Sequence, residues 1–260
     1  MNTYESLNEN VYFVRTEYKD IFTTVYLIKT EAGALLFDAA SYDVDIRDAV
    51  IPMLESVGVS ANELKYVFIS HGHADHAGGL AELLAHYPDV TVITPNERLR
   101  ELYPDTKFLV PEEYETVLGD LKIIFIPGHT ADSEAILDTR TNILISGDCL
   151  QLYGIVGSGN WASNINYPAE HRLAVKKLRE LDIELVATAH DYKPYGQFYR
   201  GKERIAMALD ACTDPLDRIE WLIFKNPELD DEGIAKIYNS TPNMPTLASR
   251  IVGAVRREMK

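Results

Sequence analysis

The chain has 260 residues, of which 46% are hydrophobic and 25% charged, which suits one large or two small globular domains with a sizeable core. Its formal net charge is −15, and such a surface repels phosphate backbones, so we expect no nucleic-acid partner. The two cysteines, Cys149 and Cys212, lie far apart, and no signal peptide or long apolar segment is evident. We therefore expect no disulfide framework, no membrane segment and a cytoplasmic location.

The first 70 residues alternate strand patterns with one helix. Short apolar runs separated by turn residues predict strands at 11–16, 23–29, 34–39 and 66–70. Apolar residues at three- and four-residue spacings predict a helix over 43–57. Asp38 ends the third strand, and the fourth strand leads directly into the stretch HGHADHAGG.

The next segments continue this alternation up to residue 199. The patterns predict helices at 79–86, 97–102 and 168–181 and strands at 91–94, 133–138, 142–146 and 183–189. A hairpin is expected across Gly119-Asp120, between strands at 114–118 and 121–126. Residues 150–167 lack a clear period and are expected to form a loop.

From residue 200 onward the pattern is helical only. We expect helices at 201–212, 214–224, 231–239 and 245–258. Prolines separate these segments, and Asp214-Pro215 marks the first break. We therefore divide the chain into a domain at 1–199 and a helical extension at 200–260. The extension is expected to pack on the domain, although it could instead cap a site or join identical subunits in a homo-oligomer.

Residues 71–79 hold the densest group of potential metal ligands. His71, His73, Asp75 and His76 fall within six positions, directly after an apolar strand. Two residues spaced by two in extended backbone point to the same side, so His71 and His73 are expected to act together. Imidazole and carboxylate are ligands that suit zinc and related divalent ions.

Further polar residues share the position of this cluster at a strand end. Each of them comes at or just after the end of a predicted apolar strand: Asp38, His129, Asp148 and His190. Strand ends and their loops are where a rigid scaffold displays reactive groups. Because all of these residues suit a metal ion, the pattern indicates that they converge on one site.

In order and spacing, these motifs resemble the metallo-β-lactamase superfamily, whose signature is H-x-H-x-D-H. The resemblance spans about residues 10–195 and implies an α/β fold, a four-layer αβ/βα sandwich, followed here by the helical extension. It implies two metal ions, the first held by His71, His73 and His129 and the second by Asp75, His76 and His190. It also implies that Asp148 bridges the ions and that Asp38 orients ligands through hydrogen bonds.

The same resemblance implies a hydrolase that uses a hydroxide bound to both metals to cleave a small carbonyl substrate. Asp75 would orient that hydroxide, and zinc is the favoured metal, with iron or manganese as alternatives. The pair Asp75 and Asp148 is similar to the glyoxalase II and lactonase branches, which suggests a thioester or a lactone. Ala131-Asp132 departs from the frequent Pro-Gly after GHT, which puts the branch in doubt and leaves the ligands unaffected.

Other functions remain open. A mononuclear-iron oxidoreductase similar to the persulfide dioxygenases keeps the same signature, and phosphodiesterases share the fold but usually need a more basic surface. A non-catalytic metal-binding module is the remaining alternative. Diiron flavoproteins of this fold carry glutamate where this chain has His73, and 260 residues leave no room for their flavodoxin domain.

The remaining candidate residues have weaker patterns. His86 and His171 are expected at the surface, and Cys149 as a small buried residue. Lys193 and Arg200 are weak candidates for contacting an anionic substrate. Aromatic residues in the loops that could line a substrate pocket, or simply pack, are Tyr153, Trp161, Tyr167, Tyr192 and Tyr195.

Overall fold

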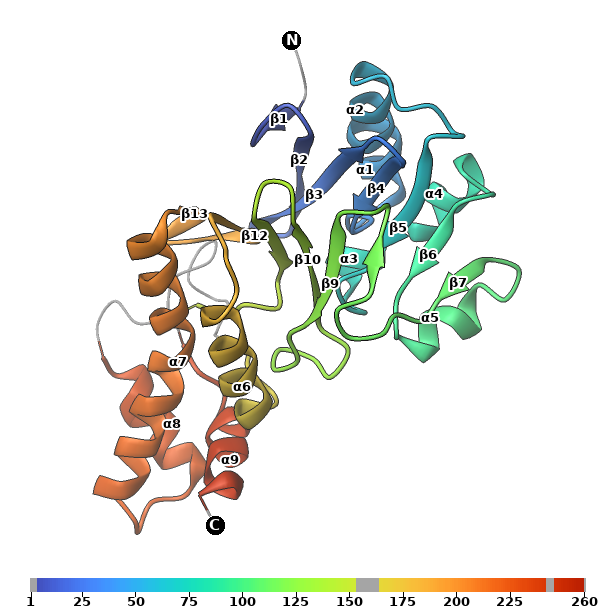
Figure 1. The fold of residues 1–260 in the computed structure, drawn as a ribbon. Helices are drawn as coiled ribbons and strands as arrows, with labels where there is room; N and C mark the ends of the chain where they lie inside the picture. The colour runs from blue at the N-terminus through green and yellow to red at the C-terminus, as the bar shows by residue number, and fades with distance from the viewer. Residues whose placement is uncertain (1–3, 153–163, 242–245, 260) are drawn as a thin grey trace.

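The computed structural model describes residues 4–152, 164–241 and 246–259, and two β-sheets with helices on their outer faces make up its fold (Figure 1). One apolar cluster contains residues from both sheets, so the sheets pack face to face. On one strand of the first sheet, Leu35 and Phe37 belong to this cluster, whereas Ala34 and Leu36 belong to a cluster with helices. This alternation follows from the two-residue period of a strand that is buried on both faces.

The first sheet contains strands in the order of the sequence. These are β1 (Glu5–Ser6), β2 (Val11–Tyr18), β3 (Ile21–Thr30), β4 (Gly33–Phe37), β5 (Leu64–Phe68), β6 (Thr91–Ile93) and β7 (Lys107–Leu109). Pairs from β1 to β4 are antiparallel, and pairs from β4 to β7 are parallel. The carboxyl ends of β4 and β5 therefore meet at one edge of the sheet.

The second sheet runs from β13 back to β8. Its strands are β8 (Thr116–Val117), β9 (Leu121–Phe125), β10 (Glu134–Asp138), β11 (Ile143–Gly147), β12 (Leu185–Tyr192) and β13 (Gly196–Arg200). Only β11 and β12 pair in parallel, which requires a crossover between them. The crossover includes α6 (Pro168–Arg179), which packs on the outer face of this sheet.

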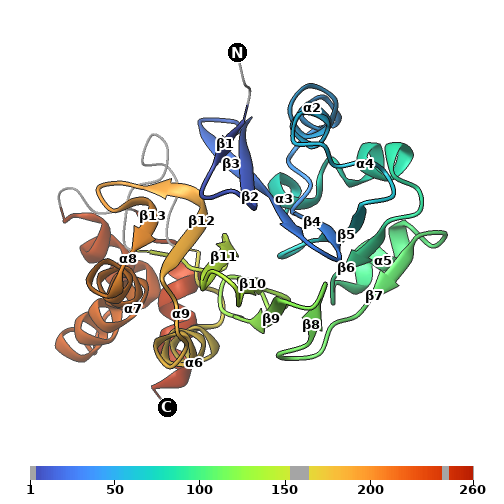
Figure 2. The ribbon, with the colours of Figure 1, turned by 45° about the horizontal axis from the view of Figure 1, so that its top comes forward.

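Helices cover the outer face of each sheet, as Figure 2 shows from above. On the first sheet these are the π-helix η1 (Ile46–Val50), which follows the short α1 (Asp43–Asp45), and α2 (Ile51–Ser56), α3 (Ala74–Ala77), α4 (Leu80–His86) and α5 (Glu97–Leu102). On the second sheet α6 packs beside α7 (Lys202–Lys225). The order helix, sheet, sheet, helix confirms the predicted fold class.

The C-terminal part consists of the end of α7 with α8 (Asp231–Asn239) and α9 (Ser249–Glu258). The predicted break at Asp214-Pro215 is wrong, because α7 runs through Pro215 without interruption. Cys212 before the proline packs on the second sheet, and Leu216 after it packs with α8 and α9. Packing on both sides thus outweighs the hydrogen bond that proline cannot donate. Because α7 packs with both parts, the division into 1–199 and 200–260 stays a proposal.

The sequence patterns missed three short strands, β1, β7 and β13. They lie at sheet edges or ends and carry polar residues at positions where a buried strand would be apolar. The prediction also ended β12 at residue 189, whereas the strand continues through His190 to Tyr192. Within the described ranges, every helix is too short or too polar to cross a bilayer.

Candidate metal centre

The residues predicted as metal ligands lie in two adjacent groups. The first contains His71, His73, His129 and Asp148, and the second contains Asp75, His76 and His190. Within each group, one donor atom per residue lies within 4.8 Å of all the others. All are buried except His73, which reaches the surface. Seven potential ligands, four from residues 71–76 and three from distant parts of the chain, are therefore gathered into two compact donor sets.

Strand ends from both sheets position these side chains. His71 and His73 follow β5, His129 follows β9, and Asp148 follows β11. The 71–79 segment lies close against residues after β4, and a Cβ on Gly78 would lie 2.1 Å from the carbonyl oxygen of Ser41. Only glycine permits this close approach, which holds α3 and its two donors against the sheet edge.

Hydrogen bonds fix the orientation of two histidines in the first group. The Ser70 hydroxyl donates to Asp38 Oδ2 at 3.0 Å, so it accepts from His71 Nδ1 at 3.2 Å. His129 Nδ1 donates to the carbonyl oxygen of Asn164 at 2.8 Å. Each ring therefore carries its hydrogen on Nδ1 and turns a lone pair on Nε2 toward the centre of the group.

These lone pairs converge on His73. Its Nδ1 lies 2.8 Å from Nε2 of His71 and 2.9 Å from Nε2 of His129, and Asp148 Oδ2 lies 3.2 Å from the latter atom. One hydrogen on His73 cannot satisfy two nitrogen acceptors and a carboxylate. A cation in their midst would satisfy all of these atoms.

The second group is arranged in the same way. His76 Nδ1 donates to Asp38 Oδ2 at 2.6 Å, and His190 Nδ1 donates to the carbonyl oxygen of Phe22 at 2.7 Å. Their Nε2 atoms lie 3.4 and 3.6 Å from Asp75 Oδ2. In the described residues, the buried Nε2 of His76 has no hydrogen-bond partner, although such atoms are normally paired. The donor set of imidazoles and carboxylates fits a divalent metal ion at each group.

The electrostatics of the two groups agree with this assignment. Burial, and then the neighbouring His76, hold the pKa of His71 well below its ordinary value, so its imidazole is neutral. Burial alone would raise the pKa of Asp148, but His129 lowers it well below its ordinary value. Burial would lower the pKa of His76, yet Asp75 raises it well above 6.5. The site thus attracts positive charge, which a metal ion can supply in place of a proton.

Three side chains that sequence reasoning did not assign to the centre hold its carboxylates. The Tyr192 hydroxyl and Gln151 Nε2 donate to Asp148 Oδ1 at 2.9 and 2.8 Å. The Thr23 hydroxyl donates to Asp75 Oδ2 at 3.1 Å. Only Tyr192 had a sequence signal, because it follows His190 by two positions and so faces the same side of β12.

The prediction that His171 is solvated is wrong. Its side chain is buried, and a Cβ on Gly128 would lie 2.6 Å from it, so it packs against the loop that carries His129. Burial lowers the pKa of His171 to about 4, which keeps the ring neutral. Helical spacing could have predicted this burial, because His171 lies three and seven positions before Ala174 and Leu178 and so shares their buried face of α6.

The other secondary predictions have mixed outcomes. His86 is exposed and Cys149 is buried, as expected, and both cysteines are free. Tyr167 is exposed, so it does not belong to the core. Tyr153 and Trp161 lie outside the described residues.

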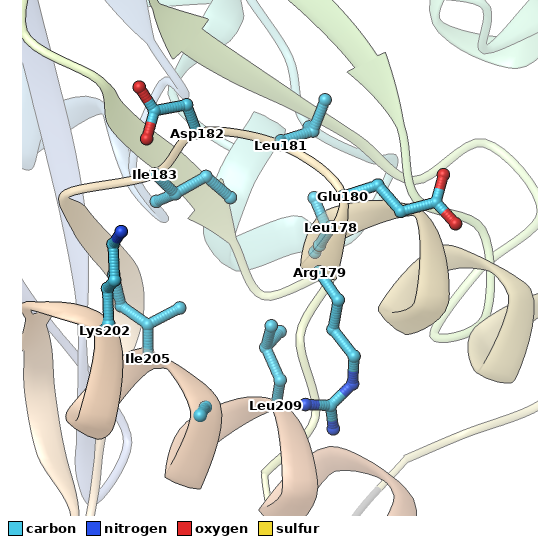
Figure 3. A pocket seen from close by; sticks show the side chains of 10 residues that line it. Leu178, Arg179, Glu180, Leu181, Asp182, Ile183, Lys202, Ile205 and Leu209 are labelled. Carbon is cyan, nitrogen blue, oxygen red and sulfur yellow. The ribbon is translucent and has the colours of Figure 1, made fainter.

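A hollow of about 490 Å³ lies apart from the metal-ligand residues, between the end of α6 and the start of α7 (Figure 3). Leu178, Ile205 and Leu209 form its apolar part, and Arg179 and Lys202 extend beside them. It contains none of the seven donors, so we assign the chemistry to the strand ends.

Comparisons with known proteins agree with the fold. A sequence model described as the metallo-beta-lactamase superfamily matches residues 18–190. YobT of Bacillus subtilis (strain 168) is 29% identical over 161 residues, which are 53% of this chain and 67% of YobT. Beta-lactamase-like protein 2 homolog of Caenorhabditis elegans is 28% identical over 177 residues, which are 65% of this chain and 55% of that protein.

Solved structures share the fold at lower identity. Rubredoxin oxygen:oxidoreductase of Desulfovibrio gigas has a TM-score of 0.66 at 16% identity, over 83% of this chain and 62% of that one. DIM-1 metallo-beta-lactamase has a TM-score of 0.63 at 14% identity, over 82% of this chain and 97% of that one. The matched region 18–190 contains all seven potential donors and the strands from β3 to β11, together with most of β12. The chain therefore belongs to the metallo-beta-lactamase superfamily.

Proposed function

We propose that this protein is a metal-dependent hydrolase that cleaves a small carbonyl compound with two divalent ions, preferably zinc. The position of Asp148 between the two donor groups carries this proposal. Its Oδ2 lies 3.2 Å from Nε2 of His129, and its Oδ1 lies 3.5 Å from Nε2 of His190. One carboxylate can therefore serve both groups, as a bridging ligand does.

Bound cations would supply a water of lowered pKa and polarise the carbonyl oxygen of the substrate. The chain itself contributes orientation. Thr23 holds one oxygen of Asp75, which lies between the rings of the second group and is positioned to orient a water. Tyr192 and Gln151 hold Asp148, so both carboxylates keep one geometry during turnover.

Two hollows beside the donor groups support a small substrate. One, of about 450 Å³, is lined by His73 with Leu99, Leu102 and Tyr103, which is the size and character of a small-molecule pocket. The other, of about 550 Å³, includes Lys193 next to the end of β12. Leu99, Leu102 and Tyr103 offer an apolar wall for an acyl or lactone group, beside the polar Asn96, Arg98, Thr130 and Asp132, so thioesters and lactones are the proposed substrate class.

A redox function with iron is the second candidate. The solved structures of similar fold include a flavo di-iron protein of Thermotoga maritima, with a TM-score of 0.64. At 17% identity, this likeness supports a shared fold and not a shared activity. Oxygen uptake by the iron-loaded protein, without hydrolysis of any ester, would favour this candidate.

Metal analysis combined with a substrate panel tests the proposal. Purified protein should contain two zinc ions per chain and turn over thioesters or lactones faster than β-lactams or phosphodiesters. Asp148→Ala should lose at least one ion and reduce kcat/KM by at least about 100-fold. Asp89→Ala, at an exposed carboxylate that belongs to neither donor group, is the control. Full metal content with normal turnover in Asp148→Ala would refute the bridging role.

A further inference from the structure

The segment 164–167 joins the candidate metal centre to the C-terminal helices. It precedes α6 and lies between the loop of His129 on one side and α9 on the other. We propose that Arg250 of α9 is a positioning residue for the metal centre, acting through Asn164 and Asn166 on His129 and Asp148. This inference rests on the proposed metal binding but does not depend on which reaction the protein catalyses.

Four hydrogen bonds attach the segment to the loop that carries His129. The carbonyl oxygen of Asn164 accepts from His129 Nδ1 at 2.8 Å, and Asn166 Nδ2 donates to the carbonyl oxygen of His129 at 2.6 Å. The N–H groups of Asn166 and Tyr167 donate to the carbonyl oxygen of Gly128 at 2.8 and 2.9 Å. The orientation of the His129 ring therefore follows the position of this segment.

The same segment reaches Asp148 through Gln151. The N–H of Asn164 donates to Gln151 Oε1 at 2.8 Å, and Gln151 Nε2 donates to Asp148 Oδ1 at 2.8 Å. Gln151 Nε2 also lies 2.7 Å from the carbonyl oxygen of Asp148. Asn164 is thus connected to two donors of the first group. It binds His129 directly, and it reaches Asp148 through the side chain of Gln151.

The C-terminal helices hold this segment from the opposite side. Arg250 donates to Asn166 Oδ1 at 2.7 Å and to Asn164 Oδ1 at 2.6 Å through its two terminal nitrogens. A planar guanidinium that makes two such bonds fixes the separation of its acceptors. Between the two asparagines, Ile165 is fully buried in the apolar cluster with Leu216 and Ile251.

The hydrogen bond on Nδ1 determines how His129 can bind a metal ion. While Asn164 accepts from Nδ1, the lone pair of Nε2 stays directed at His73 and Asp148. If the segment moves away, Nδ1 loses its acceptor and the ring can change tautomer or rotate. Loss of such a partner of a ligand typically weakens metal binding by about 10- to 100-fold.

Metal affinity in matched variants of α9 tests the proposal. Arg250→Ala in the full chain should weaken zinc binding about tenfold in competition with a chelator. The matched control is Arg256→Ala, because Arg256 makes comparable bonds to Asp231 Oδ1 at 2.7 Å and to the Leu229 carbonyl at 2.9 Å, within the C-terminal helices. Arg256→Ala should keep zinc affinity within about twofold of the unaltered protein.

A second measurement reports on His129 without any metal ion. In metal-free protein labelled with ¹⁵N-histidine, the Nδ1–H signal of His129, assigned by its absence in His129→Gln, should exchange with solvent about tenfold faster in Arg250→Ala. Asn164→Ala removes one acceptor of Arg250 but keeps the backbone carbonyl, so it should reproduce part of the effect. The double variant should be less affected than the sum of the single effects on a logarithmic scale.

The outcomes separate this inference from the proposed function. Unchanged zinc affinity and unchanged His129 exchange in Arg250→Ala would overturn the positioning role, as would an equal loss of affinity in Arg256→Ala. If Arg250→Ala does not fold, the same measurements on Asn164→Ala and Arg250→Lys decide the matter. If the unaltered protein binds no metal ion, the proposed function fails, while the exchange measurement still tests Arg250.

Discussion

Histidines at the candidate metal centre are oriented by the ring nitrogen that faces away from it. His71 is held by Ser70, His76 by Asp38, His129 by the Asn164 carbonyl and His190 by the Phe22 carbonyl. Two of these partners are backbone carbonyls, which no sequence motif marks. The ligand types are therefore visible in the sequence, whereas the groups that orient them are largely determined by the path of the backbone.

Asp38 is the side chain whose substitution tests this orientation most directly. Asp38 accepts from the N–H of Ser70 at 2.8 Å and from His76 Nδ1 at 2.6 Å. In Asp38→Asn, the amide oxygen can accept from only one of these two groups, and the amide NH₂ then faces the other. Because the backbone N–H of Ser70 cannot change, we expect His76 to move its hydrogen from Nδ1 to Nε2. We expect about 10- to 100-fold weaker binding of one metal ion, with the fold retained because asparagine tolerates the positive φ of 67° at this position.

Metal content after dialysis against a weak chelator, with thermal unfolding as the folding control, measures this effect. Asp43→Asn, which changes an acidic residue in the first turn of α1, is the matched control. Two tightly bound ions in Asp38→Asn would contradict the role assigned to Asp38.

Glu134 makes stability depend on pH. Its carboxyl is buried, and within the described residues neither of its oxygens makes a hydrogen bond. Burial, and then the charges of Asp132 and Glu113, raise the pKa of Glu134 to about 9. Between the unfolded pKa near 4.5 and this value, the folded state holds a proton that the unfolded state has lost. The stabilisation is therefore complete below about pH 4.5 and is lost as pH rises toward 9.

Glu134→Gln removes this titration. Relative to the unaltered protein, the variant should gain at least about 1 kcal/mol in free energy of unfolding between pH 5 and pH 9. Urea denaturation at both pH values measures the difference, and the exposed Glu112→Gln serves as the control. If the difference in free energy of unfolding between Glu134→Gln and the unaltered protein is the same at both pH values, Glu134 is ionised in the folded protein.

At the scale of elements, Arg140 connects the β10–β11 turn with the first sheet. It donates to both oxygens of Asp138 at 2.9 and 2.8 Å and to the carbonyl oxygen of Lys29, on β3, at 2.9 Å. The Asp138 side chain is fully buried, so removal of Arg140 leaves a carboxylate without its counter-charge. Arg140→Ala should lower the free energy of unfolding by about 2–3 kcal/mol.

Arg179→Ala provides the comparison for that measurement. Arg179 pairs with Asp210 at 2.6 Å, but both side chains are accessible to solvent. Arg179→Ala should therefore lower the free energy of unfolding by only about 0–1 kcal/mol. Chemical denaturation of both variants at the same pH and salt concentration measures the difference. Equal losses in the free energy of unfolding would show that the folded protein does not depend on Arg140 as the partner of Asp138.

The elements that the sequence patterns predicted well are those with a strong local period. β2, β3 and β9 have dense apolar runs, and the hairpin across Gly119-Asp120 has the pairing expected of it. Pro215 in α7 misled the prediction because local propensity opposes a helix there while packing on two clusters favours it. The buried face of α6 escaped notice because His171 is a polar residue at an apolar position.

At the scale of the whole molecule, α7 is shared between the sandwich and the C-terminal helices. Ile205 and Leu209 complete the cluster on the second sheet, so a chain that ends after Tyr199 exposes the part of the outer face that α7 covers beside α6. We expect this shortened chain to lose its cooperative thermal transition and to bind hydrophobic dyes. A sharp transition near that of the full chain would instead show that 1–199 folds alone.

The predicted contact between identical subunits stays a prediction. On the second half of α7, Leu222 and Ile223 are buried, whereas Trp221 and Phe224 are exposed. Scattered exposed apolar residues are common on monomers.

Local pattern in the sequence determined most strands and helices, the acidic surface and the identities of the candidate metal-binding residues, because these depend on residues close together along the chain. The family resemblance already implied how the seven donors divide into two groups, whereas only the tertiary structure brings the donors of each group together. Tertiary structure also decided that Gln151 and Thr23 hydrogen-bond the carboxylates of Asp148 and Asp75, that Arg250 binds Asn164 and Asn166, and that His171 is buried. These contacts join segments that lie far apart in sequence, and their geometry follows from the packing of two sheets and two helical layers.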